Sequence, residues 1–199
     1  MATLTPDMLI AAYCQGIFPM AGDDGEIHWY DPHPRAIIPL DAFHVPRRLA
    51  RTVRQGRFAV RTDTSFRAVM QACAEPAQGR ETTWISAQMI DAYAALHQMG
   101  MAHSVEVWRD ERLIGGLYGV AIRGLFAGES MFSRERDASK VALVHLVERL
   151  QRGGFVLLDS QFLGSPHLLQ FGLIEIPRQE YRRRLARALQ VEASWGSVP

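Results

Sequence analysis

The sequence predicts a mixed α/β fold, and three observations support this class. The 199 residues are 48% hydrophobic and 22% charged, which is typical of one globular domain with a buried core. Helix start and stop signals recur before residue 100, whereas residues 103–133 alternate in polarity and are rich in Val, Trp, Tyr, Phe and Gly. A long helical segment and an apolar segment follow. We therefore expect an antiparallel sheet crossed over by a helix to a further strand.

The chain begins with a short predicted helix and a segment rich in turn residues. Thr5 suits the N-cap, Pro6 the first helical position, and Gly16 the end of the helix. The following segment, 16–39, contains four prolines and a Gly-Asp-Asp-Gly run, which favour loops. These patterns predict a loop-rich N-terminal lobe over residues 1–34 and a second domain over residues 35–199.

Capping residues, periodicity and turn signals place the remaining elements. Turns at 109–111 and 123–124 divide the alternating stretch into three antiparallel strands, and Ser139 is predicted to cap the long helix after it. The other expected elements are a helix at 46–55, a strand at 58–62, a helix from 64 or 65 to Pro76, a helix from Ser86 to Gly100, a strand at 155–161, a short helix near 166–171, a strand at 173–176 and a final helix at 177–190.

Charge and cysteine content exclude several classes of protein. The net charge of +1 gives no global attraction to nucleic acid or membrane. Only Cys14 and Cys73 occur, which argues against a disulfide framework or a thiolate zinc site. We find no signal-peptide pattern and no run of about 20 apolar residues. We expect a cytoplasmic protein without a membrane partner, and a monomer by default.

The seven histidines do not predict a metal site. No two of them have the i, i+3 or i, i+4 spacing of a helical metal site, and an HExxH pattern is absent. GxSxG and GxxxxGK[ST] motifs are absent too. We therefore expect neither a metal nor another cofactor.

Two polar positions at the ends of predicted core strands are candidates for chemistry. Glu129 lies in an apolar strand, so it either pairs with a buried cation or serves a bound amine. Asp159 and Gln161 end another apolar run, and their i, i+2 spacing on a strand places them on one face. Each position is also compatible with a structural role, but sites in α/β sheets collect at strand ends.

The predicted helix at 46–55 carries an unusual charge pattern. Arg47, Arg51 and Arg54 share one face, and residues 43–57 contain five arginines and no acid. Such a face is able to make about four or five phosphate contacts. A local basic surface is thus predicted despite the neutral total.

With these residues the sequence resembles the leucyl/phenylalanyl-tRNA–protein transferase family over nearly its whole length. The segments that carry the resemblance are AYCQGIFPM (12–20), HWYDPHPRAIIP (28–39), TWISAQMIDAYAALHQMGMAHSVEVW (83–108), GGLYGVAIRGLFAGESMFSRERDASKVAL (115–143), DSQ (159–161) and FGLIEIPR (171–178). The resemblance implies an acyl-CoA N-acyltransferase-like catalytic domain. It also implies transfer of Leu or Phe, and less efficiently Met, from aminoacyl-tRNA to the N-terminal α-amino group of proteins that start with Arg or Lys, which feeds the N-end rule degradation pathway.

The resemblance also implies roles for particular residues. Gln161 is expected to contact the attacking amine and Asp159 to polarise it, while Glu129 holds the aminoacyl α-amino group. Trp84 and Tyr93 are expected to orient the 3′ adenosine of the tRNA, and Arg47, Arg51 and Arg54 to grip acceptor-stem phosphates. An apolar pocket is needed for the Leu or Phe side chain, and its candidates, although residues of these types more often belong to the core, are Leu117, Phe126, Met131 and Leu146.

Two alternative functions remain open from the sequence. An acyl-CoA-dependent N-acyltransferase needs a glycine-rich pyrophosphate loop, but residues 133–139 contain no glycine and two acids. A non-catalytic RNA-binding module would use the arginine helix but leave Glu129, Asp159 and Gln161 without a purpose. Each alternative therefore accounts for fewer of the candidate site residues than the transferase function does.

Overall fold

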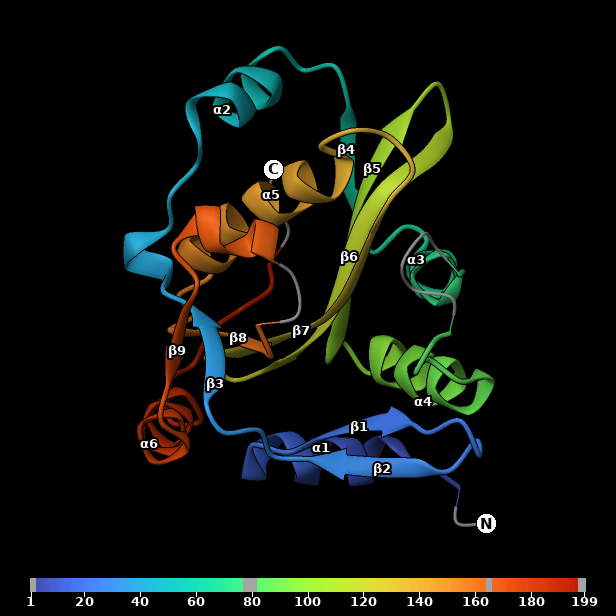
Figure 1. Ribbon diagram of the computed structural model, residues 1–199, viewed down its shortest axis with the longest axis vertical. Helices are drawn as coiled ribbons and strands as arrows, with labels where there is room; N and C mark the ends of the chain where they lie inside the picture. Colours follow the sequence, from blue (N-terminus) through green and yellow to red (C-terminus); the bar gives the residue numbers. More distant parts are fainter. Residues whose placement is uncertain (1–2, 77–81, 164–165, 197–199) are drawn as a thin grey trace.

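The computed structural model describes residues 3–76, 82–163 and 166–196. Their centre is a seven-stranded mixed sheet in the order β4-β5-β6-β7-β8-β3-β9 (Figure 1). All neighbours pair antiparallel except β7 and β8, which are parallel. The strands are β3 (Arg35–Ile38), β4 (Ala59–Thr62), β5 (Ala102–Arg109), β6 (Arg112–Ile122), β7 (Leu125–Ser133), β8 (Leu157–Gln161) and β9 (Ile174–Ile176).

Helices cover both faces of this sheet (Figure 1). On one face lies α5 (Ala138–Arg152), which connects the parallel strands β7 and β8. The helix α2 (Arg47–Arg54) packs against α5. On the other face lie α3 (Phe66–Ala74) and α4 (Ala87–Gln98). The helix α6 (Arg178–Ala188) packs beside β3, β8 and β9. This arrangement confirms the mixed α/β prediction and the crossover helix.

The N-terminal residues form α1 (Pro6–Gln15) and a hairpin of β1 (Phe18–Ala21) and β2 (Ile27–Tyr30). The Thr5 side chain accepts a hydrogen bond at the start of α1, and Gly16 ends the helix with a φ of 80°, as predicted. Leu9 and Phe18 belong to the same hydrophobic cluster as residues of α3 and α4. The first 34 residues therefore share a core with the sheet, and the domain boundary near residue 34 stays a prediction.

Two local predictions were wrong. The segment expected to be loops forms the β1–β2 hairpin and, after Pro34, the strand β3. Ser139 does not cap α5, because the N-cap lies two residues earlier, at Asp137, which has a φ of 68°. The backbone N–H of Ser139 instead donates to the hydroxyl of Ser133, at 3.2 Å. The short elements η1 (Leu40–Ala42) and η2 (Pro166–Phe171) are 3₁₀ helices.

The parallel pair of strands opens a space in the sheet. β7 and β8 are paired only from Leu125 with Leu157 to Ala127 with Asp159. Beyond these residues the two strands separate, so Glu129 on β7 and Gln161 on β8 lie on opposite sides of the opening. No helix among the described residues is long and apolar enough to cross a membrane.

Candidate active site

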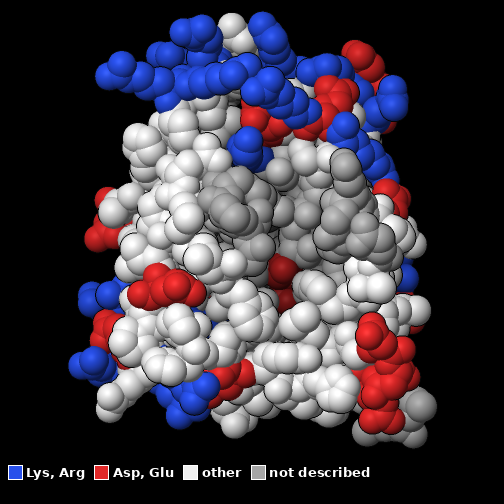
Figure 2. All heavy atoms as spheres, viewed as in Figure 1, with Lys and Arg blue, Asp and Glu red and all other residues white. Residues whose placement is uncertain are grey.

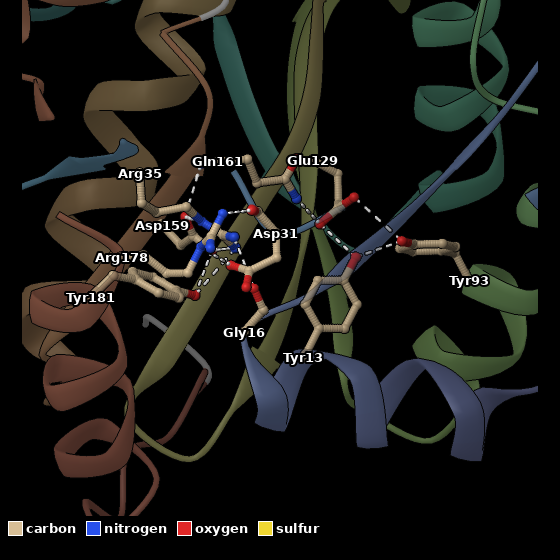
Figure 3. A network of polar contacts seen from close by, with 10 residues as sticks. All are labelled: Tyr13, Gly16, Asp31, Arg35, Tyr93, Glu129, Asp159, Gln161, Arg178 and Tyr181. Atoms are coloured by element: carbon tan, nitrogen blue, oxygen red, sulfur yellow. Dashed lines mark hydrogen bonds and ion pairs between the residues drawn. The ribbon is translucent and has the colours of Figure 1, made fainter. Parts of the chain in front are cut away.

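A cavity of about 600 Å³ occupies the opening between β7 and β8. Its polar lining includes Glu129, Ser130, Asp159, Ser160 and Gln161, and its apolar lining includes residues of β6, β7, α5 and η2. The cavity lies beside a buried polar network (Figure 3), which consists of Tyr13, Gly16, Arg35, Tyr93, Glu129, Asp159, Gln161 and Tyr181. This network brings together all three acidic and amide residues that the sequence singled out.

Glu129 is held by neutral donors (Figure 3). Its carboxylate accepts hydrogen bonds from the Tyr13 hydroxyl at 2.6 Å, the Gln161 amide at 2.7 Å and the Tyr93 hydroxyl at 3.3 Å. Burial raises the pKa of Glu129 to about 8, and the nearby charge of Asp159 adds to the effect, although the tyrosine hydroxyls oppose it. The side chain is still 9% exposed. Glu129 is thus a partly reachable acceptor that forms no ion pair with a described residue.

Asp159, in contrast, is fully buried and already paired with a cation. Arg35 forms a bidentate ion pair with it, Nε to Oδ1 at 2.9 Å and Nη2 to Oδ2 at 2.6 Å. The Tyr181 hydroxyl donates to Oδ2 at 2.8 Å, and the Gln161 backbone N–H donates to Oδ1 at 2.9 Å. Asp159 has 0% exposure, although it belongs to the residues that line the cavity beside Gln161. The expected polarisation of the attacking amine by Asp159 stays a prediction.

Gln161 connects the two carboxylates. It ends β8 with a φ of 62°, a left-handed conformation that is uncommon for a residue with a side chain. Its backbone N–H binds Asp159, and its side-chain amide N–H₂ binds Glu129. The amide oxygen accepts no hydrogen bond from the part of the chain that the structure describes. It is consequently available to accept one from a group in the cavity.

The aromatic and apolar candidates divide into two sets. Trp84 lines the cavity, as do Leu117, Met131 and Leu146. Tyr93 has no exposed surface and contacts Glu129 through its hydroxyl, so its ring is not placed to stack on an adenine. The remaining candidate, Phe126, does not line the cavity.

Phe126 belongs to the hydrophobic core instead. Its ring lies 5.6 Å from the ring of Trp195 and 6.5 Å from that of Phe155. Met131 packs against the same hydrophobic cluster as Phe126, because the β6–β7 register shifts between Gly128 and Ser130 and interrupts the alternation of faces. The sequence did not reveal this shift, or that only Met131 of the two lines the cavity.

The arginine face of α2 is exposed. Arg47, Arg51 and Arg54 all have exposed side chains, and none forms an ion pair with a described residue. Figure 2 shows basic side chains gathered over α2, at the top of the molecule. The predicted local basic surface is therefore present.

Sequence reasoning missed Arg35 and Tyr13. A buried cation was considered as a partner for Glu129, but the structure pairs the cation with Asp159. One signal was available, because Arg35 directly precedes the apolar residues Ala36, Ile37 and Ile38. A charged residue at the start of a fully buried strand needs a partner inside the protein.

One further group has ligand atoms close enough for a metal. Candidate atoms of Asp63, His97 and His103 lie within 4.8 Å of one another. Each residue is already engaged: His103 Nδ1 lies 2.9 Å from Asp63 Oδ2, His97 Nδ1 lies 2.8 Å from the Ala102 carbonyl, and the Trp195 indole N–H donates to Asp63 at 2.7 Å. These contacts anchor the C-terminal segment to β5, which gives the group a structural role.

Comparisons with known proteins match nearly the whole chain. The family model described as leucyl/phenylalanyl-tRNA protein transferase matches residues 37–186, and that of the N-terminal domain of the same transferase matches residues 2–33. Solved structures are more distant. L-PGS from Bacillus licheniformis aligns with 77% of this chain and 56% of its own at 10% identity and a TM-score of 0.45, a likeness too low to bear on the site.

Curated relatives are much closer. The leucyl/phenylalanyl-tRNA–protein transferase of Herpetosiphon aurantiacus is 59% identical over 96% of this chain and 98% of its own length. That of Gluconobacter oxydans is 57% identical over 98% of this chain and 87% of its own. These matches and the two family models establish that the chain belongs to the leucyl/phenylalanyl-tRNA–protein transferase family of enzymes.

Proposed function

We propose that this enzyme transfers Leu or Phe, and less efficiently Met, from aminoacyl-tRNA to the N-terminal α-amino group of proteins that begin with Arg or Lys. The observation that carries the proposal is the cavity itself, which combines Glu129, an amide oxygen of Gln161 that accepts no hydrogen bond from a described residue, and an apolar wall. The products would carry N-termini that the N-end rule pathway degrades. We expect the enzyme to act in the cytoplasm as a monomer, without metal or cofactor.

The reaction needs alignment more than activation, because an aminoacyl ester is already reactive. The neutral amine nitrogen of the acceptor attacks the ester carbonyl carbon, and a C–N bond forms. The C–O bond to the terminal ribose of the tRNA breaks, and the proton lost by the amine passes to the departing ribose oxygen. An amide and a tRNA with a free hydroxyl result.

The site residues suit the two amines of this reaction. Glu129 accepts the α-ammonium group of the aminoacyl moiety, whose positive charge stabilises the carboxylate and lowers its raised pKa. The amide oxygen of Gln161 accepts a hydrogen bond from the attacking amine and directs its lone pair towards the carbonyl carbon. Two different acceptors thereby separate the amine that must remain charged from the amine that must react.

The rest of the substrate is placed by the cavity wall and by α2. Leu117, Met131 and Leu146 contact the acyl side chain, and an apolar pocket distinguishes one methylene by only about 1–3 kcal/mol, which agrees with a relaxed choice of acyl group. Trp84 is available for stacking on the 3′ adenosine. The exposed arginines Arg47, Arg51 and Arg54 contact acceptor-stem phosphates.

The structure disfavours CoA as the acyl donor. In such an enzyme the pyrophosphate binds backbone N–H groups at the N-terminus of the crossover helix. At the N-terminus of α5, the Ser133 hydroxyl already accepts from the Ser139 N–H, and the acid Asp137 sits at the N-cap. An anion would meet both an occupied donor and a negative charge there.

The decisive test is transfer of radiolabelled Phe from Phe-tRNA to a peptide that begins with Arg. We expect label on the Arg peptide, little on a matched peptide that begins with Gly, and no dependence on acetyl-CoA. Label that stays on tRNA while the tRNA is bound would support an RNA-binding module. Label transfer that requires acetyl-CoA would contradict the proposed donor.

A further inference from the structure

We infer that Arg35 is a positioning residue of this enzyme, which acts through Asp159 to fix the conformation of Gln161. This inference rests on the proposed function, because it assigns Gln161 the contact with the attacking amine. Arg35 lies at the start of β3, is 1% exposed and is not among the residues that line the cavity. Its influence on the reaction must therefore pass through its neighbours.

The guanidinium of Arg35 contacts two aromatic rings, a backbone carbonyl and a carboxylate. Its central carbon lies 4.9 Å from the centroid of the Phe18 ring and 4.3 Å from that of the Tyr181 ring. Its Nη1 donates to the Gly16 carbonyl at 2.8 Å, at the C-terminal end of α1, where the helix dipole favours a cation. Its remaining two donors form the bidentate pair with Asp159. Only a planar fork matches this set of acceptors.

The fixed carboxylate in turn holds the end of β8. Asp159 Oδ1 accepts from both Arg35 Nε and the backbone N–H of Gln161, each at 2.9 Å. The second bond stabilises the left-handed backbone of Gln161, a conformation that is unfavourable for a residue with a side chain. That backbone conformation directs the Gln161 side chain to Glu129 and its amide oxygen to the cavity.

The same contacts connect the reaction centre to α1 at two points. Tyr13, near the end of α1, donates to Glu129, and Gly16, at its C-cap, accepts from Arg35. Gly16 also has to be a glycine, because an added Cβ would lie 3.0 Å from the Tyr181 ring, and its φ is 80°. Both carboxylates of the network are thereby located relative to one helix.

This arrangement predicts that Asp159 works as a hydrogen-bond acceptor rather than as a base. An asparagine at 159 keeps an oxygen for the Gln161 N–H but leaves Arg35 as an unpaired buried charge. The double variant, Arg35→Gln with Asp159→Asn, removes both charges. It keeps an oxygen at position 159 that accepts from the Gln161 N–H, and it leaves no unpaired buried charge. The double variant should therefore be more active than either single variant, because the backbone of Gln161 is held again.

The test measures kcat and KM for Phe-tRNA with the full-length protein and an Arg-initiated peptide. We expect Arg35→Gln and Asp159→Asn each to lower kcat at least a hundredfold with KM for Phe-tRNA within about threefold, and the double variant to recover at least tenfold. Circular dichroism and thermal unfolding establish which variants are folded, and concentrations are corrected for the folded fraction. Arg149→Gln is the matched control, since Arg149 donates to the carbonyl of Trp195, away from the cavity. It should lower the Tm without lowering kcat.

Two results would overturn the inference. A folded Arg35→Gln variant with wild-type kcat would show that Arg35 does not position the site. A folded double variant no more active than Asp159→Asn would show that the charge of Asp159 itself is needed. If the wild-type protein transferred no label at all, the proposed function would fail instead, so the two failures are distinguishable.

Discussion

Arginine occurs in two opposite environments in this protein. Arg35 is buried, and every contact that it makes is with the protein itself. Arg47, Arg51 and Arg54 on α2 are exposed, and none is ion-paired with another described residue. The buried arginine fixes geometry, whereas the exposed ones are free to bind a polyanion. The type of residue is the same, and only the surroundings separate the two roles.

The acids show the same contrast within a single network. Asp159 has a cation and no exposure, while Glu129 has only neutral donors and remains partly exposed. A carboxylate that is already paired has little to offer a substrate amine. The unpaired carboxylate has a raised pKa, and its charged form is stabilised most by an incoming cation.

Breaking the buried ion pair should have the largest effect. Asp159→Ala leaves Arg35 without its counter-charge, so we expect a loss of about 3–5 kcal/mol in the free energy of unfolding. Turnover should collapse while tRNA affinity is nearly unchanged, because α2 is not affected. Guanidinium unfolding, single-turnover transfer and filter binding measure the three quantities. Normal turnover would exclude a role for Asp159 in the chemical step.

The unpaired acid should make stability depend on pH. The pKa of Glu129 is raised from 4.5 to about 8, so between these values the folded state holds a proton that the unfolded state has lost. The resulting stabilisation is complete below the unfolded pKa and declines as the pH rises, by about 3 kcal/mol from about pH 5.5 to about pH 8.

Glu129→Gln should abolish that decline, which denaturant unfolding at several pH values detects. Glu111→Gln is a suitable control, because Glu111 is exposed and paired with Arg61. It should retain the wild-type pH dependence. An equal decline in the Glu129→Gln variant would assign the effect to another group.

The exposed arginines should control the salt dependence of tRNA binding. Replacing Arg47, Arg51 and Arg54 by Gln should weaken binding and reduce the slope of log K against log salt by roughly 2–3, since each phosphate contact contributes just under one unit. The triple replacement of Arg182, Arg183 and Arg184 is the matched control, because these form ion pairs with Asp31 and Glu180. Equal slopes for the wild type and the α2 variant would remove this helix from the tRNA interface.

The smallest expected effect concerns the acyl side chain. Met131→Ala enlarges the cavity and should shift the ratio of kcat/KM for Phe over Leu by about tenfold towards Phe. Phe126→Leu changes a residue of the core and should lower stability while leaving that ratio within about twofold. Competition between Leu-tRNA and Phe-tRNA measures the ratio. A shift in the second variant alone would reverse the assignment of the two residues.

Local signals in the sequence predicted much of the fold. The N-cap at Thr5, the stop at Gly16 and the turns that bound β6 all depend on neighbouring residues, and each was found where expected. The strand β3 was missed because it has only four residues, all buried, so it shows no alternation between its flanking prolines. The N-cap Asp137 was missed because Asp and Ser have about equal capping propensities, so the local sequence does not distinguish Asp137 from Ser139.

The site was predictable in its members but not in its connections. Glu129, Asp159 and Gln161 were recognisable as polar residues at the ends of apolar strands. The partner of Asp159 was not, because Arg35 is 124 residues away and no local pattern links them. The burial of Tyr93 and Phe126 likewise depends on how the faces of the sheet are covered.

The position of β3 in the sheet also determines how late in translation the active site can form. β3 is made early, yet both of its partners in the sheet, β8 and β9, lie within residues 157–176. Until the ribosome has released them, the apolar residues Ala36–Ile38 have no strand to pair with and Arg35 has no carboxylate. A nascent chain is therefore inactive and exposes an unpaired strand for most of its translation. Premature termination before residue 157 would yield a protein for quality control to remove, never a partly active transferase.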